Sequence, residues 1–402
     1  MARPHLAVIF GAGNVGRGFL GQLFTESGYR VIFVDVVEPL LRAINERGSY
    51  TLELVTDEMV QKHEIGGVSA LSSRDTDSVA EAIARCDLAA TAVGAGVLLR
   101  IAPVVAAGLE RRRKDAKAEP LNIIICENLK DAPGVFAGLL REHLSADGRR
   151  YLEESVGLVD AVISRMVPIM SEEVASRDPS FILAEPYKVL PVNRSRFRGE
   201  IPRIVGMEPR DNFVAFVDRK LYTHNAGHAM IAYLGYLRGY TYGYEALDDS
   251  RVGSVVRRAL HESSEALIRR HGMDADEQYE HVADLLRRFR NRRLGDTVFR
   301  LGRDPVRKLA SNDRLVGAAL LVLETGGEPD ALSWGIAAAL RFDPAEDPVS
   351  QDLQGRLSRA PVEAVLSEIS GLEPGGRLSR MIVERYQALG SGQWPPTSVP
   401  ER

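Results

Sequence analysis

The chain has 402 residues, of which 45% are apolar and 26% are charged, and its formal net charge at pH 7 is −4. These values are ordinary for a globular protein of two or three domains, and they exclude a strongly basic field that would recruit nucleic acid or an anionic membrane. No apolar run is long enough to cross a bilayer. We expect a cytoplasmic protein without a signal peptide, whose two cysteines, Cys86 and Cys126, are buried and reduced and hold no metal.

The first motif is a glycine-rich turn between two apolar runs. Leu6 to Phe10 predicts a buried parallel strand, and the turn Gly11-Ala-Gly-Asn-Val-Gly-Arg-Gly18 follows it. A helical pattern then runs from Phe19 to about Ser27, and a second strand begins at Arg30 and ends at Asp35. This order of strand, turn, helix, strand and acid is the order of a dinucleotide-binding unit.

Each glycine of the turn has its own physical reason. Gly11 permits the tight turn, Gly13 lets the backbone approach a pyrophosphate, and Gly16 lets the helix pack closely on the strand. Asp35 can accept both hydroxyls of a ribose and would repel a 2′-phosphate, which favours NAD over NADP. The residues predicted to contact the cofactor are Phe10, Gly11, Ala12, Gly13, Asn14, Val15, Gly16, Arg17, Asp35, Ala92, Val93, Gly94 and Asn128.

Further α/β units follow the first one. Strands are predicted from Asp87 to Val93, from Leu121 to Cys126 and from Val156 to Ile163. Asn128 stands just after the second of these strands, at the edge where ligands bind in doubly wound sheets. The alternative is that this asparagine only shapes a turn.

The chain changes character near its middle. Residues 181–197 alternate between apolar and polar, with prolines, and predict a small antiparallel excursion from the main sheet. Beyond it, helical periodicity dominates, and Asp211 is a plausible N-cap for the next helix. We therefore predict a Rossmann-type α/β domain over residues 1–203, a mainly α-helical domain over 204–390 and a flexible tail over 391–402.

Three polar residues mark the start of the helical half. On an α-helix Lys220, Asn225 and His228 fall at about 0°, 140° and 80°, just before the apolar run of residues 229–237. An ammonium, an amide and an imidazole on one face could move a proton, hold an oxyanion and orient a hydroxyl. Otherwise the lysine extends to solvent, the asparagine caps a carbonyl and the histidine is a core residue. For His224, packing is the better interpretation.

A cationic stretch lies at Arg300-Leu-Gly-Arg-Asp-Pro-Val-Arg-Lys308. Four cations in nine residues, around a glycine and a proline, could form a loop that binds a phosphate or a carboxylate. From charge and spacing we predict Arg303 and Arg307 as phosphate ligands. The alternative is a solvated surface, since the preceding residues are basic as well.

Motifs in both halves resemble those of the polyol-specific long-chain dehydrogenases/reductases, the mannitol dehydrogenase family. The pattern Lys220-x4-Asn225-x2-His228, followed by Ala232-Tyr-Leu-Gly235, resembles the family signature. The other matching segments, in the family's order, are FGAGNVGRGF (10–19), TAVGAGVL (91–98), LNIIICEN (121–128), GMEPRDNFVAFVDRKLYTHNAGHA (206–229), RLGRDPVRKLASNDRL (300–315), GIAAALRF (335–342) and SEISGL (367–372). The resemblance is strongest to the branch that acts on mannitol 1-phosphate, because relatives that act on free mannitol or hexuronates are usually longer.

The resemblance implies a metal-independent, NAD-linked reaction that interconverts mannitol 1-phosphate and fructose 6-phosphate. It makes Lys220 the general base of alcohol oxidation and the acid of ketone reduction. It also implies that Asn225 and Asn128 polarise the reacting oxygen and that His228 positions the substrate. Arg300 and Lys308 match family positions that contact the polyol.

The chain departs from the family pattern at two places. Ile163-Ser-Arg165 stands where the family commonly has Val-Asp-Arg. Val217 stands three residues before Lys220, where some relatives carry a glutamate proposed as a proton path, so the route of proton release stays open. A dehydrogenase of a free polyol or hexuronate, or a non-catalytic NAD sensor, remains an alternative. We expect the protein to act on a small polyol or sugar phosphate as a monomer or small homo-oligomer.

Overall fold

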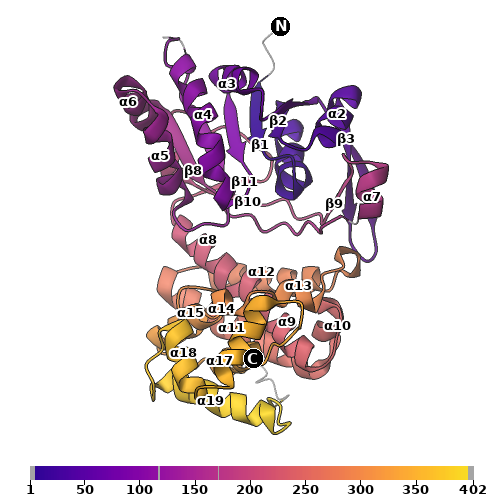
Figure 1. Ribbon diagram of the computed structural model, residues 1–402, viewed down its shortest axis with the longest axis vertical. Helices are drawn as coiled ribbons and strands as arrows, with labels where there is room; N and C mark the ends of the chain where they lie inside the picture. Colours follow the sequence, from indigo (N-terminus) through magenta and orange to yellow (C-terminus); the bar gives the residue numbers. More distant parts are fainter. Residues whose placement is uncertain (1–4, 116–117, 171, 397–402) are drawn as a thin grey trace. The chain divides into compact units, whose positions relative to one another are not determined.

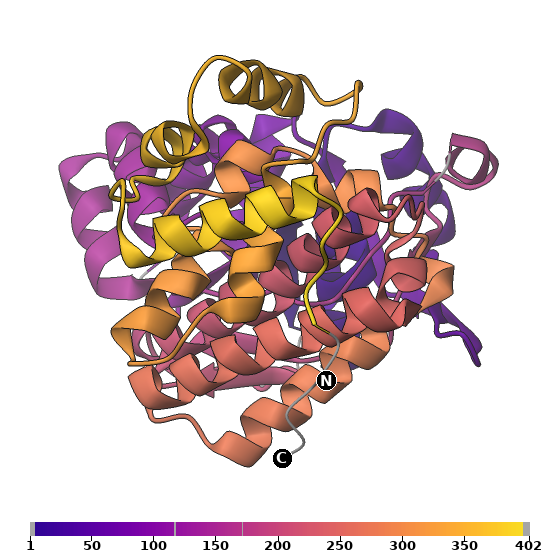
Figure 2. The same ribbon diagram turned by 90° about the horizontal axis from the view of Figure 1, so that it is seen from below.

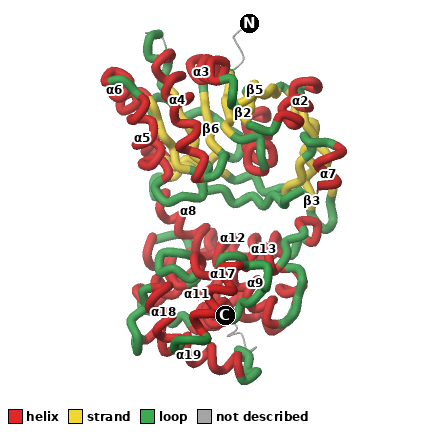
Figure 3. The backbone as a smooth tube through the Cα atoms, viewed as in Figure 1, coloured by secondary structure: helices red, strands yellow, loops and turns green. Residues whose placement is uncertain are grey.

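The structure is a computed structural model that describes residues 5–115, 118–170 and 172–396. The chain divides into two compact units, Met1–Phe213 and Val214–Arg402. The first contains the strands and the second is helical, as the colours of Figure 3 show, which confirms the predicted fold class. The predicted boundary near residue 203 lies before the last strand of the first unit, and the observed division lies after it.

A six-stranded parallel sheet forms the centre of the first unit (Figure 1). Its order is β5-β2-β1-β6-β7-β8, and every neighbouring pair is parallel. In chain order these six strands run 3-2-1-4-5-6, the doubly wound arrangement whose topological switch point lies between the first and fourth strands. The strands are β1 (Leu6–Phe10), β2 (Arg30–Asp35), β5 (Val68–Ser72), β6 (Leu88–Thr91), β7 (Leu121–Ile125) and β8 (Val156–Asp160).

Helices cover both faces of this sheet because successive strand residues point to opposite sides. On β1, Ala7 and Ile9 join one apolar core, and Val8 and Phe10 join the other. The first core includes residues of η1 (Gly16–Gly21), α1 (Gln22–Glu26) and α2 (Glu38–Arg47). The second core includes residues of α3 (Thr76–Arg85), α4 (Leu98–Arg112), α5 (Ala132–His143) and α6 (Ala146–Ser155), and the short η2 (Ala95–Val97) precedes α4.

The predicted antiparallel excursion over residues 181–197 is wrong in direction. Both strands found there are parallel to their partners: β9 (Ile182–Ala184) pairs with β3, and β10 (Leu190–Asn193) pairs with β11. Such short strands have no periodicity that reveals direction, which depends on partners far away in the chain. Among the described strands, β3 and β4 pair antiparallel, and an isolated antiparallel bridge joins Val192 to Ala161. The remaining elements are β3 (Ser49–Val55), β4 (Val60–Gly66), α7 (Glu172–Arg177), η3 (Arg194–Arg196) and β11 (Met207–Arg210).

The second unit is built around α9 (Ala226–Leu237), nine of whose twelve residues are buried. α9 packs against α10, α11, α13 and α16, and the last long helix, α19, packs on α16 (Figure 2). Its elements are α8 (Phe213–Arg219), η4 (Lys220–Asn225), α9, α10 (Gly243–Asp248), α11 (Ser250–His271), α12 (Ala275–Phe289), η5 (Arg292–Leu294), α13 (Val298–Gly302), α14 (Pro305–Lys308), α15 (Val316–Glu324), α16 (Asp330–Ala339), α17 (Pro348–Leu357), α18 (Val362–Ser370) and α19 (Arg377–Gly390).

The first residues of the predicted tail contact the helical unit. The guanidinium of Arg238 lies 5.5 Å from the ring of Trp394, and Arg258 donates a hydrogen bond of 3.2 Å to the carbonyl of Pro396. Residues 397–402 of the predicted tail lie outside the described residues. Among the helices that the structure describes, none has the length and apolar character needed to cross a membrane.

Candidate functional site

The glycine-rich turn follows β1 at the switch point of the sheet. Gly11 has φ +94°, and a Cβ there would lie 2.3 Å from the carbonyl oxygen of Ala92, so both backbone conformation and space require glycine. A Cβ on Gly16 would lie 2.0 Å from the carbonyl oxygen of Gly11. A Cβ on Gly13 would meet nothing within 4 Å. Two glycines thus shape the turn, and the third leaves its outer side open.

Asp35 connects the end of β2 to this turn. Its Oδ2 accepts a hydrogen bond of 2.7 Å from the backbone N–H of Ala12. Its Oδ1 accepts bonds of 2.6 Å and 3.1 Å from the N–H groups of Val36 and Val37. A carboxylate offers about four acceptor sites, so roughly one is left in this arrangement for a ribose hydroxyl.

The helix after the turn begins earlier than predicted. Residues 14 and 15 are already helical, and Gly16–Gly21 form a π-helical segment before α1. Arg17 is 7% exposed and donates hydrogen bonds to the carbonyls of Ala12 and Ser180, at 2.5 Å and 2.6 Å. Phe10 is buried in the sheet core. The side chains of these two predicted cofactor residues therefore hold the fold together.

The ends of β6 and β7 are joined by a residue that the sequence analysis did not single out. Glu127 accepts hydrogen bonds from the backbone N–H groups of Val93, at 3.0 Å, and Gly94, at 2.8 Å. This carboxylate fixes the loop that contains the predicted cofactor residues Ala92, Val93 and Gly94. The next residue, Asn128, is exposed. The position of Glu127, an acidic residue that follows a buried strand, was the sequence signal that could have identified it.

In the helical unit, the segment Lys220–Asn225 is a π-helix between two α-helices. The N–H of Ala226 donates to the carbonyl of Leu221, five residues earlier. The predicted angles assumed α-helical geometry, which does not hold here: a π turn bonds residues i and i+5, so Lys220 and Asn225 lie on the same side. His228 follows three residues after Asn225 on the α-helical α9, again as a neighbour on one face.

His228 lies among aromatic rings. Its ring centroid is 4.9 Å from that of His224 and 4.2 Å from that of Phe289. Burial lowers the pKa of His228 to about 3, and nearby Arg300 and Arg314 add to the effect. Burial likewise lowers the pKa of His224, whose Nδ1 has no hydrogen-bond partner among the described residues. Both imidazoles are therefore neutral at physiological pH.

The cationic loop predicted from the sequence forms α13, α14 and the turn between them. Arg300 pairs with Asp296, and Arg307 pairs with Asp304 at 2.9 Å. Lys308 is 4% exposed, and its ammonium donates to the carbonyl of Arg303. Burial lowers the pKa of Lys308 to about 7, with further lowering by Arg314 and Arg307. The ammonium therefore titrates near neutral pH.

The position of the family's glutamate is not a proton path in this chain. Val217 exposes 42% of its surface on α8 and carries no ionisable group. The adjacent Asp218 binds Nε2 of His271 at 2.8 Å. Val217 therefore cannot carry a proton from the site to solvent.

Residues 5–206 match the mannitol dehydrogenase Rossmann domain, and residues 212–390 match the mannitol dehydrogenase C-terminal domain. The chain belongs to the mannitol dehydrogenase family. Two solved structures of similar fold cover nearly all of it. Pseudomonas fluorescens mannitol 2-dehydrogenase, in a ternary complex with NAD and D-mannitol, has a TM-score of 0.73 and 16% identity, over 97% of this chain and 92% of that one. A D-sorbitol dehydrogenase in substrate-free form has a TM-score of 0.79 and 17% identity, over 96% and 93%.

In this member of the mannitol dehydrogenase family, the predicted site residues fall into two groups. The glycine-rich turn, Asp35, the loop after β6 and Asn128 belong to the first unit. Lys220, Asn225 and His228 belong to the second, together with the loop of α13 and α14. Within the second unit, the sequence analysis did not single out Arg288 and Arg314, two cations that act on His228.

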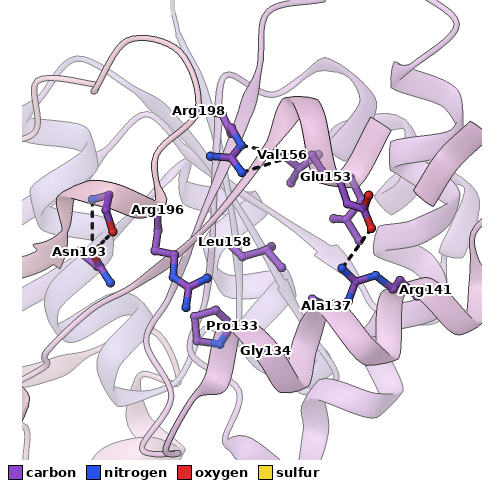
Figure 4. A pocket seen from close by; sticks show the side chains of 12 residues that line it. Pro133, Gly134, Ala137, Arg141, Glu153, Val156, Leu158, Asn193, Arg196 and Arg198 are labelled. Atoms are coloured by element: carbon purple, nitrogen blue, oxygen red, sulfur yellow. Dashed lines mark hydrogen bonds and ion pairs between the residues drawn. The ribbon is translucent and has the colours of Figure 1, made fainter. Parts of the chain in front are cut away.

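A cavity of about 570 Å³ lies elsewhere in the first unit, beside the edge strand β8 (Figure 4). Three arginines line it, and none of the predicted site residues does. Arg141 and Arg198 bond to the side chain and backbone of Glu153, and Arg196 lies 3.7 Å from Asp160. All three arginines therefore already interact with acidic residues or a backbone carbonyl of the protein. Among the described residues, no three His, Cys, Asp or Glu side chains form a metal site.

Proposed function

We propose that this chain is a metal-independent, NAD-dependent dehydrogenase that interconverts D-mannitol 1-phosphate and D-fructose 6-phosphate. The observation that carries the proposal is the π-helical segment that brings Lys220 and Asn225 to one side of the helix, with His228 next to them. The family assignment and the glycine-rich turn after β1 support a hydride transfer to NAD.

The residues of the first unit fit NAD. The open side of Gly13 leaves room for a pyrophosphate beside the start of the helix, where free N–H groups favour an anion. Asp35 offers an acceptor for a ribose hydroxyl and a charge that repels a 2′-phosphate. Asn14, Val15 and Gly94 complete the proposed contacts around this turn.

Lys220 supplies the proton chemistry of the proposal. NAD⁺, when bound, would supply the acceptor for the hydride of the carbon that bears the hydroxyl, and the amine of Lys220 would take the hydroxyl proton. Asn225 and Asn128 donate hydrogen bonds to the oxygen as its charge changes. The neutral imidazole of His228 orients a neighbouring hydroxyl. In the reverse direction, the ammonium of Lys220 returns the proton to the ketone oxygen.

The cationic loop supports a phosphorylated substrate. Arg300 and Lys308 are proposed to contact the polyol chain, and Arg303 and Arg307 were predicted as phosphate ligands. Arg303 is exposed to solvent, whereas Arg307 already pairs with Asp304 and lies 3.6 Å from Asp313. The specificity for a phosphorylated substrate therefore depends on which cations of this loop can bind the phosphate group.

A free polyol or a hexuronate is the second candidate substrate. Two observations favour it: the pairing of Arg307 with Asp304, and the two solved structures of similar fold, which are a mannitol 2-dehydrogenase and a D-sorbitol dehydrogenase. A non-catalytic NAD sensor is the third candidate. We further propose that the protein is cytoplasmic and acts as a monomer or small homo-oligomer. Light scattering after gel filtration measures the oligomeric state.

NADH-coupled turnover with fructose 6-phosphate, fructose and a panel of hexuronates separates these candidates. We expect fructose 6-phosphate to give the highest kcat/KM; a preference for fructose or a hexuronate would replace the phosphate assignment, and no turnover on any of them would favour the sensor. Lys220→Ala is expected to lower kcat by roughly 10²- to 10⁴-fold. Lys62→Ala, which removes a lysine from β4 of the other unit, is the matched control.

A further inference from the structure

Arg314 is a nearly buried guanidinium beside the cationic loop. Its side chain is 11% exposed, and its Nε donates a hydrogen bond of 2.7 Å to Oδ1 of Asp313. Among the described residues, neither of its terminal nitrogens has a hydrogen-bond or ion-pair partner. These two nitrogens carry four N–H groups in a planar fork, the geometry that suits the oxygens of a phosphate.

The surroundings of Arg314 belong to the proposed substrate site. Asp313, its partner, also faces Arg307, whose Nη1 lies 3.6 Å from Oδ2. The charge of Arg314 also lowers the pKa values of His228 and Lys308. Arg314 thus acts on residues of both α9 and α14. The geometric link between Arg314 and the cationic loop is Asp313, whose carboxylate lies 2.7 Å from Nε of Arg314 and 3.6 Å from Nη1 of Arg307.

The charges between residues 296 and 314 do not balance. Five cations, Arg300, Arg303, Arg307, Lys308 and Arg314, stand against three carboxylates, Asp296, Asp304 and Asp313. Two positive charges are left when Lys308 is protonated. A phosphate monoester carries between one and a half and two negative charges at pH 7, roughly the amount that this surplus would neutralise.

We propose that Arg314 forms the subsite that binds the phosphate group of the substrate, together with Lys308, whose ammonium is assigned here to the phosphate and no longer to the polyol chain. The inference rests on the proposed function. It replaces the predicted phosphate ligands, Arg303 and Arg307, with two side chains that are more deeply buried. Arg303 is exposed, and Arg307 is 49% exposed and already paired, so hydrogen bonds from these side chains compete with water. A hydrogen bond from a buried guanidinium to a charged oxygen is stronger, because solvent screens it less.

The test is Arg314→Gln, measured as the ratio of kcat/KM for mannitol 1-phosphate to kcat/KM for mannitol. We expect this ratio to fall by roughly 10- to 100-fold, and inorganic phosphate to inhibit the variant much less than the wild type. Arg303→Gln and Arg307→Gln are expected to lower the ratio by less than about threefold. Arg356→Gln removes an arginine of α17 that pairs with Asp352 on the same helix and with Glu368 on α18, and it is the matched control.

The outcomes distinguish this inference from the proposed function. If the wild type does not prefer the phosphorylated substrate, the proposed function fails. If the wild type prefers it and Arg314→Gln keeps the ratio, or if Arg303→Gln lowers the ratio more, the subsite is wrong. Arg314→Lys keeps the charge without the fork, and we expect an intermediate ratio. The melting temperature and the NADH affinity of each variant show whether it folds. Among the described residues, the side chain of Arg314 bonds only to its neighbour Asp313, so we expect the fold to be kept.

Discussion

Oδ2 of Asp35 accepts a hydrogen bond of 2.7 Å from the backbone N–H of Ala12. The acid at the end of β2 therefore holds the glycine-rich turn in place before any cofactor binds. A residue predicted for its contact with ribose also has a structural role. The two roles can be separated, because one needs a negative charge and the other needs only an acceptor oxygen.

Asp35→Ala removes both roles, and Asp35→Asn keeps an acceptor without the charge. We expect Asp35→Ala to lower the free energy of unfolding by about 1–3 kcal/mol, since it leaves the N–H of buried Ala12 without its partner. Both variants should raise the NADP/NAD ratio of kcat/KM, because the charge that repels a 2′-phosphate is lost. If both variants kept the NADP/NAD ratio of the wild type, Asp35 would not contact the ribose.

Gly11 and Gly13 should respond differently to an added methyl group. Gly11→Ala places a Cβ 2.3 Å from a backbone oxygen at a positive φ, so we expect a loss of at least about 2 kcal/mol of stability. Gly13→Ala meets no atom within 4 Å, so its melting temperature should stay close to that of the wild type. Its NADH affinity should fall, because the methyl group occupies the pyrophosphate side. Equal melting temperatures for the two variants would contradict this account.

Lys308 should make substrate affinity depend on pH. Burial lowers the pKa of Lys308 to about 7, so the unliganded ammonium loses its proton as the pH rises above 7. A phosphate monoester keeps its full charge there, and we expect KM for mannitol 1-phosphate to rise up to about tenfold between pH 7 and pH 8.5. Lys308→Arg stays charged and should flatten the rise. The same slope in both proteins would assign the titration to another group.

Buried histidines should make the helical unit sensitive to acid. Burial lowers the pKa of His281 to about 3, so the unfolded chain binds a proton near pH 6.5 while the folded chain does not. Stability from this group is present above pH 6.5 and is lost as the pH falls towards 3. We expect His281→Gln to lose roughly 1–2 kcal/mol less than the wild type between pH 7 and pH 5 in urea unfolding. His5→Gln, at an exposed histidine, should follow the wild type.

The sequence predicted those features that depend on strong local patterns. The apolar runs at β1, β2 and β7, the position of Gly11 and Gly16, and the helical second half follow from periodicity and glycine chemistry. β4 was missed because most of its residues are exposed and polar. Strand direction at β9 and β10 was wrong because distant partners decide it.

For the site, the sequence identified the residue types but not their partners. Nothing local distinguishes Arg307, which pairs with Asp304, from Arg314, whose terminal nitrogens have no partner in the part of the chain that the structure describes. Arg17 stands inside the cofactor motif, yet its side chain bonds to a carbonyl 163 residues further along the chain. Such pairings depend on tertiary structure, and only the fold reveals them.

The π-helical segment at Lys220–Asn225 makes the site depend on backbone geometry as well as on residue identity. A π turn contains one residue more than an α turn, so it is equivalent to a one-residue insertion in the helix from Phe213 to Leu237. If the same residues formed an uninterrupted α-helix, Asn225 and His228 would be turned by about 100° relative to Lys220, and the π turn is what absorbs the extra residue. The chemistry of this helix is therefore encoded partly in a single extra position.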